Sequence, residues 1–262
     1  MKKIRAAWLP IFFIIGILFS SCKKDALSRL NVYLTDAPSA YDAVNIEVVE
    51  IQVKASSDQG ESGWIKMPMA TSPVIYNLLD FRNGMETLLT SAELPSGNIS
   101  QLRLILGTKN SIVVNGVTEP VELQVPSGQQ TGLKFNINAY LFPGVDYDLW
   151  IDFDAARSII IDGTGAYKLK PVIRTFTDAT SGAIKGVVLP SEANAMIEAS
   201  NAVSTLHGMP DPVTGEFLIR GVPDGKWNVH IKGSNGYLDQ TLNNISVSIG
   251  QQTNVGTIIL TQ

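Results

Sequence analysis

Cysteine and histidine are scarce in this sequence. It has one cysteine, Cys22, and two histidines, His207 and His230, in 262 residues. A single cysteine excludes an intrachain disulfide, and neither histidine has a neighbour at the spacing of a zinc site or of a cysteine–histidine nucleophile pair. The chain also lacks a GxSxG elbow, a phosphate-binding loop and a GxGxxG motif after a strand. We therefore expect this chain not to be an enzyme.

Positive charge is also in short supply. The 20 Lys and Arg residues are outnumbered by 24 Asp and Glu, which gives a net charge of −4 at pH 7. Lys2, Lys3 and Arg5 supply three of the positive charges, so a chain that began at Cys22 would carry −7. This negative charge argues against nucleic acid, and against anionic lipid, as a general partner.

The N-terminus has the layout of a secretory signal. A positive start is followed by an apolar run over 6–19, which is shorter than the roughly 20 residues of a transmembrane helix. The sequence FSSC then resembles a lipoprotein processing site, with Phe19 where leucine is usual. We expect a signal peptide over 1–21, lipidation of Cys22 and a lipidated tether over 22–29.

The residues after Cys22 bear on the membrane that would hold the lipid. In Gram-negative lipoproteins, aspartate directly after the cysteine is associated with the inner membrane, whereas this chain has Lys23 and Lys24. By that resemblance we expect the protein to be anchored in the cell envelope, at the outer membrane. Whether the protein faces the periplasm or the cell surface is left open.

Alternating apolar and polar residues dominate the segment 30–176, with the period of two expected of half-buried strands. The alternation is clearest in residues 30–34, 99–106, 133–137 and 147–153. In 44–53 it shifts by one between Val48 and Val49, which predicts a β-bulge. Residues 78–90 have a spacing nearer to that of a helical face, so we expect a short helix or irregular insert there.

A second unit follows a change in composition. Pro171 predicts that the segment 167–176 lies at a sheet edge or bulge. The polar stretch TDATSG predicts a linker over 177–182. Beyond it, roughly five to seven short strand patterns separated by turn residues predict a small antiparallel sandwich over 183–262. The expected fold class is thus all-β, with two antiparallel sandwich-like domains, 30–176 and 183–262.

Both predicted domains resemble known families. The phrases that carry the first resemblance are VYLTDAPSAYDAVNIEVVEIQV, YNLLDFRNGMETLLTSAELPSGNISQLRLILG, TGLKFNINA and LWIDFDAARSII. They are similar to the family called domain of unknown function 4382, over about 30–175, which implies a β-rich fold and supplies no catalytic residues. The phrase TGEFLIRGVPDGKWNV resembles the transthyretin-like, carboxypeptidase regulatory-like domain, which implies a β-sandwich. Gly221 and Gly225 flank its tight turn.

One strand carries an acidic edge. Alternation places these side chains on one face: Asp148, Trp150, Asp152 and Asp154. The carboxylates could bind calcium through oxygen ligands, or act as an acid–base pair in glycan hydrolysis. A solvated polar face with an ion pair to Arg157 accounts for the same residues. We favour the solvated face, because no glycine-bearing calcium loop accompanies the carboxylates.

Asp36 and Trp150 are further candidate site residues. Asp36 opens the turn DAPS, where we expect its carboxylate to accept N–H groups of that turn. Alternatively, Asp36, Asp80 and Asp152 form a metal site if the fold brings them together. Trp150 is a candidate platform for stacking a sugar, although it also fits an ordinary place in a sheet.

These observations favour a membrane-anchored lipoprotein with a non-catalytic binding or structural role at the cell envelope. Its expected partners are the membrane, through the lipid, and an extracellular glycan or envelope protein. A calcium- or glycan-binding surface module is the alternative. A glycan-active hydrolase using Asp152 and Asp154 is less expected, because two carboxylates on one exposed strand do not flank a substrate.

Overall fold

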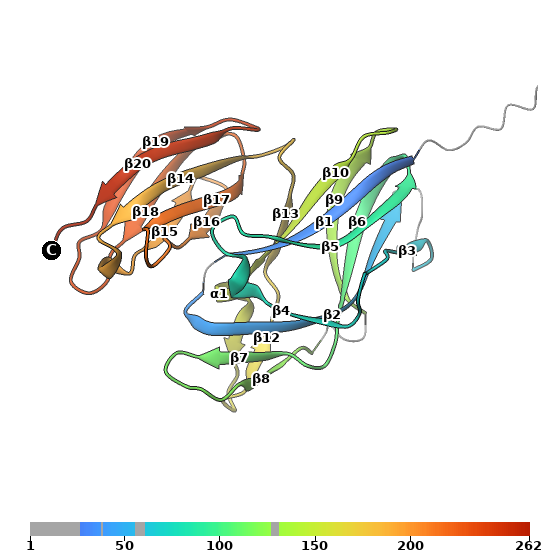
Figure 1. Cartoon of the computed structure of the whole chain (residues 1–262), viewed down its shortest axis with the longest axis horizontal. Coiled ribbons are helices and arrows are strands. Elements are labelled where there is room, and N and C mark those ends of the chain that lie inside the picture. Colours follow the sequence, from blue (N-terminus) through green and yellow to red (C-terminus); the bar gives the residue numbers. More distant parts are fainter. Residues whose placement is uncertain (1–26, 38, 56–60, 127–130) are drawn as a thin grey trace, which may run out of the picture.

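The computed structural model describes residues 27–37, 39–55, 61–126 and 131–262 (Figure 1). Strands make up most of these residues, so the expected all-β class is confirmed. The predicted signal peptide, Cys22 and most of the predicted tether lie outside the described residues.

The described residues of the N-terminal unit form thirteen strands and two single-turn helices. In chain order they are β1 (Leu27–Ala37), β2 (Tyr41–Ala55), β3 (Trp64–Lys66), β4 (Val74–Asn77), η1 (Leu78–Phe81), β5 (Thr87–Pro95), β6 (Gly97–Leu106), β7 (Ser111–Val114), β8 (Val121–Gln124), β9 (Leu133–Leu141), β10 (Tyr147–Asp154), α1 (Ala155–Ser158), β11 (Ile159–Ile161), β12 (Tyr167–Leu169) and β13 (Ile173–Phe176). One sheet has the order β13-β10-β1-β5. The other runs β11-β12-β8-β7-β2-β6-β9, with β3 and β4 also paired to β2.

The C-terminal unit has seven strands in two sheets. Its elements are β14 (Gly182–Leu189), η2 (Ser191–Ala193), β15 (Met196–Ser200), β16 (Thr205–Gly208), β17 (Glu216–Val222), β18 (Gly225–Lys232), β19 (Gln240–Val247) and β20 (Gln252–Ile259). The sheets have the orders β17-β14-β20 and β16-β15-β18-β19. Most neighbouring strands are antiparallel, and the parallel pairs include β1 with β10 and β14 with β20.

Each unit has its own apolar core, built from the inward side of the alternating strands. In β1 the side chains of Leu30, Val32 and Leu34 are buried in the N-terminal core. In β18 the side chains of Trp227 and Val229 are buried in the C-terminal core. A sandwich arises because each sheet has one apolar face to remove from water.

The bulge predicted in the long strand β2 is confirmed. Val48 pairs with Leu106 and Glu50 pairs with Ile105, so Val49 is the extra residue opposite one step of β6. An extra residue reverses which face the following side chains point to, which explains why both Val48 and Ile51 are buried.

The predicted helical insert over 78–90 is only partly right. The helix is the short 3-10 turn η1, and β5 already begins at Thr87. Asn83 and Gly84 have positive φ angles of 54° and 79°, which end the helical path before a second turn can form. Pro171 likewise ends a strand, since β12 and β13 on its two sides belong to different sheets.

The connection between the units is short and internally bonded. Strand β13 ends at Phe176 and β14 begins at Gly182. The carbonyl of Thr177 accepts hydrogen bonds from Thr180 N at 3.1 Å and from Ser181 Oγ at 2.7 Å. Both Thr177 and Ser181 are buried. The connection is therefore a compact turn that limits how far the two units can move apart.

Candidate functional site

The acidic face of β10 lies under the C-terminal unit. Only 5% of Trp150 and 4% of Asp152 is exposed, whereas Asp148 is exposed and accepts a hydrogen bond from Asn31 Nδ2 at 2.7 Å. The expected solvated face is therefore wrong at Trp150 and Asp152. Alternation places these side chains on one face, but the strands that cover the face come from residues far along the chain.

Aromatic rings stack across three neighbouring strands at this interface. Trp150 on β10 lies between Tyr33 on β1 and Phe176 on β13, with ring centroids 5.4 Å and 5.6 Å away and interplanar angles of 18° and 8°. Tyr33 and Phe176 are the cross-strand neighbours of Trp150 in the sheet, so the pairing register itself builds the stack. With both neighbours stacked and little exposed surface, Trp150 offers no platform for a sugar, and that prediction is wrong.

Arg220, from β17 of the C-terminal unit, closes over this stack. Its guanidinium carbon lies 4.4 Å from the ring centroid of Trp150, a cation–π distance. Arg220 Nη1 donates to Glu86 Oε2, and Trp150 Nε1 donates to the same oxygen at 2.5 Å. Arg220 Nη2 also pairs with Asp178 at 3.2 Å. We call this set of Arg220, Trp150, Glu86, Phe176 and Asp178 the Arg220 clamp.

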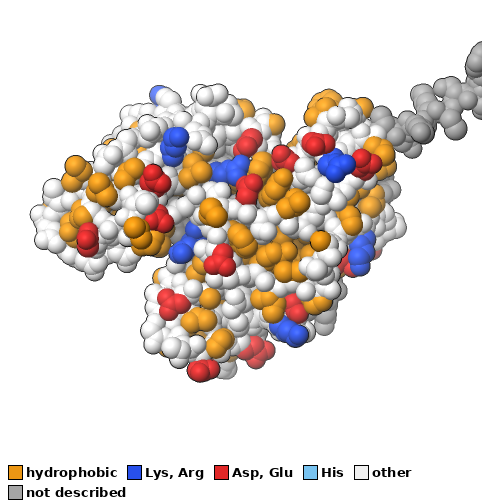
Figure 2. Space-filling view, in the orientation of Figure 1, with side chains coloured by type: hydrophobic (Ala, Val, Ile, Leu, Met, Phe, Trp, Pro, Cys, Tyr) orange, Lys and Arg blue, Asp and Glu red, His pale blue; other side chains and the backbone are white. Residues whose placement is uncertain are grey.

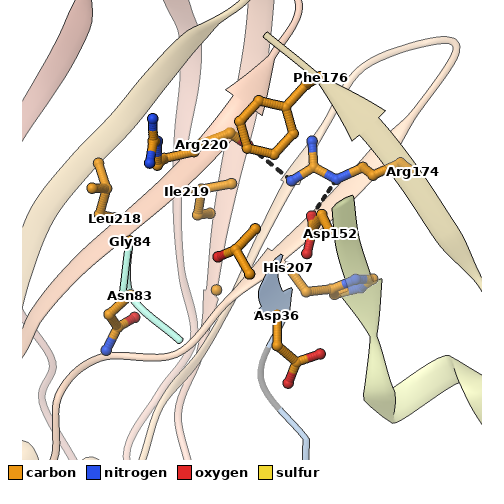
Figure 3. Close-up of a pocket in the computed structure, with 12 residues that line it drawn as sticks. Asp36, Asn83, Gly84, Asp152, Arg174, Phe176, His207, Leu218, Ile219 and Arg220 are labelled. Carbon is orange, nitrogen blue, oxygen red and sulfur yellow. Dashed lines mark hydrogen bonds and ion pairs between the residues drawn. The ribbon is translucent and has the colours of Figure 1, made fainter. Parts of the chain in front are cut away.

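Arg174, on β13, makes a second bridge between the units (Figure 3). Its Nε donates to Asp152 Oδ2 at 2.5 Å, and Asp152 is its cross-strand partner in the sheet. Its Nη1 donates to the carbonyl of Gly221 at 2.7 Å, and its Nη2 to the carbonyl of Arg220 at 2.8 Å. One guanidinium thus neutralises the buried Asp152 and binds two backbone acceptors of the other unit.

At Gly221 the N-terminal unit packs closely against the backbone of β17. Its φ is 65°, and a Cβ at this position would lie 2.5 Å from the ring of Phe176 and 2.7 Å from Arg174 Nη1. Glycine is therefore required here twice, for the backbone angle and for the space. Its predicted place at a tight turn is correct, since β17 ends at Val222 and β18 begins at Gly225.

Asp36 is almost fully buried beside this interface, with 6% of its surface exposed. Its Oδ1 accepts a hydrogen bond from the backbone N–H of Ala155 at 3.2 Å, and its Oδ2 has no hydrogen-bond partner among the described residues. We expected this carboxylate to accept N–H groups of its own turn. That prediction is wrong for Oδ1, because its donor is the N–H of Ala155 in α1. Burial, followed by the negative charge of Asp152, raises the pKa of Asp36 well above its ordinary value.

A solvent-open cleft of about 890 Å³ lies beside the Arg174 bridge. Polar side chains from both units line it, among them Asp154, Arg157, Glu198, Asn201, Thr205 and His207. Asp154 accepts a hydrogen bond from the backbone N–H of Arg157 at 3.0 Å, as the N-cap of α1, and lies 3.9 Å from its guanidinium. The expected ion pair with Arg157 is thus confirmed for Asp154, whereas Asp152 pairs with Arg174.

The predicted acidic residues are only partly brought together. Asp36 and Asp152 interact, but Asp80 is exposed on η1 and accepts a hydrogen bond from Asn77 Nδ2 at 2.9 Å. In the part of the chain that the structure describes, no group of three or more His, Cys, Asp or Glu side chains could hold a metal ion. The described residues also include no helix with the length and apolar character needed to span a membrane.

Sequence reasoning missed the two arginines of this site and the carboxylate of Glu86. Arg174, Arg220 and Glu86 lie on three strands or loops that are distant in sequence, and their partners are separated from them by 22 to 134 positions. The one available signal was that the acidic edge of β10 needed a cation. Arg157 was the nearest in sequence, but Arg174 is the cross-strand neighbour of Asp152.

Replacing Gly221 by alanine tests the tight contact between the units. We expect Gly221→Ala to lower the free energy of unfolding by roughly 1–2 kcal/mol for the left-handed backbone and by a further 1–3 kcal/mol for the clash with Phe176. Gly250→Ala is the matched control, because its φ is 69° and nothing lies within 4 Å of its Cβ position. Equal losses in denaturant titrations of the two variants would contradict the contact.

The raised pKa of Asp36 predicts a pH dependence of stability. Its folded pKa lies above its unfolded value, so the protonated carboxyl contributes stability at low pH that is lost as pH rises through the folded pKa. We expect Asp36→Asn, which cannot ionise, to gain stability relative to the native chain as pH rises from about 4, the ordinary pKa of an unfolded aspartate, through the raised folded pKa. Melting curves of both proteins across this range check it, and a constant difference would refute it.

The calcium hypothesis has a simple check. Asp152 is paired with Arg174, and Asp154 caps α1, so we expect melting temperatures in 10 mM calcium and in chelator to agree. A calcium site with a dissociation constant of about 1 mM would add about 1.4 kcal/mol of stability under these conditions. A rise in melting temperature in calcium that corresponds to this gain in stability would restore the calcium-binding alternative.

Solved structures resemble this chain only weakly. The Bacillus anthracis TIE protein matches with a TM-score of 0.25 and 9% identity, over 90% of this chain and 35% of that one. A leucine-rich repeat protein from Bacteroides thetaiotaomicron matches with a TM-score of 0.20 and 10% identity, over 89% of this chain and 26% of that one. A group B streptococcus pilus 2b backbone protein has a TM-score of 0.19 and 13% identity, with coverages of 84% and 85%. This chain thus spans about a third or less of the first two proteins, and at these scores the matches carry no functional inference.

A protein-family model matches most of the N-terminal unit. No curated protein matches this chain. A family model described as Domain of unknown function (DUF4382) matches residues 27–171, close to the range of the resemblance noted in the sequence. Because the match covers more than half of the chain, this protein belongs to the DUF4382 family.

Proposed function

We propose that this protein is a lipid-anchored, non-catalytic module of the cell envelope, in which two β-sandwiches are held as one stiff body. The proposal rests on one observation: Trp150 and Asp152, the residues of β10 considered for binding or catalysis, lie in the contact between the two units. Trp150 stacks under Arg220, and Asp152 pairs with Arg174. Groups that are engaged in holding two units together are not free to bind and turn over a substrate.

The anchor and the C-terminal unit belong to the same proposal. The FSSC sequence at residues 19–22 supports lipidation of Cys22, and the lysines that follow support retention at the outer membrane. The phrase TGEFLIRGVPDGKWNV, with seven strands in two sheets, supports a transthyretin-like, carboxypeptidase regulatory-like sandwich. Such a body would present the C-terminal unit at a set distance and angle from the membrane.

The surface most suited to an envelope partner is the interdomain cleft of about 890 Å³. Its carboxylates, amides and hydroxyls are hydrogen-bonding groups suited to a polar partner, such as a glycan or a polar protein loop. Glu198 also pairs there with Lys232 at 2.9 Å, so part of its charge is already balanced. The cleft is formed by both units, and its shape therefore depends on the interface remaining closed.

Substitution of Cys22 tests the anchor. We expect the native protein to incorporate labelled palmitate and to sediment with membranes, and Cys22→Ser to lose both, because serine lacks the thiol to which the lipid is attached. Since Cys22 is the only cysteine, the loss of label cannot come from a second acylated thiol. Native protein that fractionates as soluble and unlabelled would refute the anchored part of the proposal.

Substitution of Arg220 tests the stiff body. Spin labels attached to cysteines at Val117 and Leu238, both exposed and in different units, report the spread of distances between the units when Cys22 is replaced by serine. We expect Arg220→Met to widen this spread and to remove roughly 2–3 kcal/mol of charged hydrogen bonding.

Arg29→Met is the matched control for this experiment, because it removes an arginine from an exposed pair with Glu93 within one sheet. We expect the distance distribution of this control to match that of the native protein. A distribution that Arg220→Met leaves unchanged would contradict the clamp.

A further inference from the structure

One end of the N-terminal unit exposes apolar side chains beside the start of β1. Four large hydrophobic residues there are about half exposed, with Leu27 at 47%, Tyr140 at 53%, Phe142 at 60% and Val145 at 53%. The rings of Tyr140 and Phe142 contact edge to face, with centroids 4.8 Å apart. Figure 2 shows a small group of hydrophobic side chains at this end of the unit, with charged side chains close by. We call these four residues the apolar tip.

The backbone holds the apolar tip in a defined shape. Residues 142–145 form a turn in which Val145 N donates to the carbonyl of Phe142 at 3.1 Å, with Pro143 second and Gly144 third at a φ of 70°. Proline followed by a residue with positive φ is the pattern of a type II turn. The N–H of Gly144 donates to the carbonyl of Leu27 at 2.8 Å, and Ser28 Oγ donates to the carbonyl of Val145 at 2.5 Å. The turn is thus fastened to the first residues of β1.

The sequence before β1 limits how far this end can lie from a lipid on Cys22. Five residue steps separate Cys22 from Leu27, and an extended chain advances at most about 3.6 Å per step, so the reach is about 18 Å. This is less than the thickness of one bilayer. A lipid inserted at Cys22 would therefore keep Leu27, the first residue of the apolar tip, within about 18 Å of the membrane surface.

We propose that the apolar tip inserts its side chains into the interfacial region of the bilayer that carries the Cys22 lipid, and so fixes the orientation of the protein on the membrane. This inference rests on the proposed anchor. The chemistry of the apolar tip suits the interfacial region of a bilayer, because aromatic rings with a polar edge, such as Tyr140, concentrate at the membrane–water interface. Asp146 is exposed at the next position, which favours zwitterionic over anionic headgroups.

Fluorescence quenching in vesicles tests this contact. A cysteine at position 142, Phe142→Cys, can carry a fluorophore in the lipidated protein, because the thiol of Cys22 would be consumed by the lipid. Val203→Cys is the matched control, since Val203 is 91% exposed but lies in the C-terminal unit. In phosphatidylcholine vesicles with spin-labelled acyl chains, we expect at least a threefold stronger quenching at position 142 than at position 203.

A second arm separates this inference from the anchor. The chain from residue 22 with Cys22→Ser carries an N-terminal hexahistidine segment and binds to vesicles that contain nickel-chelating lipid, which supplies a tether without acylation. We expect the same contrast between positions 142 and 203. Loss of palmitate labelling with the contrast retained in this arm would refute only the anchor. Equal quenching at both positions in this arm, or in the lipidated protein, would overturn insertion of the apolar tip.

Discussion

The contact on which the two-unit architecture depends is the guanidinium of Arg220 lying over Trp150, while Glu86 binds both. Trp150 can take part only because the register of β1, β10 and β13 places Tyr33 and Phe176 on either side of it. An arginine held between an aromatic face and a carboxylate is partly desolvated, which strengthens its cation–π and ionic interactions. The interface therefore links the order of strands in one sheet to the position of the other unit.

The two buried carboxyl groups at this interface, those of Asp152 and Asp36, have different surroundings. Asp152 is matched by Arg174, which also satisfies two carbonyls of β17. No cation among the described residues forms an ion pair with Asp36, and burial raises the pKa of its carboxyl even though the charge of Arg82 acts in the opposite direction. A buried ion pair adds little net stability, but separating its partners is costly, so an arrangement of the units that leaves Asp152 without Arg174 is disfavoured.

The sequence predicted local features well, because these depend on neighbours along the chain. Alternation located the strands, and the parity shift at Val49 located the bulge. Alternation also placed Asp148, Trp150 and Asp152 on one face, but it could not say what covers that face. The same limit applies to Asp36, whose donor Ala155 lies 119 positions away, and to Arg220, whose partner Glu86 lies 134 positions away. The end of the helix after Phe81 depended on the positive φ angles of Asn83 and Gly84, which the spacing of the apolar residues does not report.

The compact turn at Thr177–Ser181, the Arg174 bridge and the Arg220 clamp together imply that the two sandwiches unfold as one cooperative body, although each has its own core. Calorimetry of the chain from residue 22 to residue 262 tests this most directly. The account predicts a single transition whose calorimetric and van't Hoff enthalpies agree. Two separate transitions would contradict it.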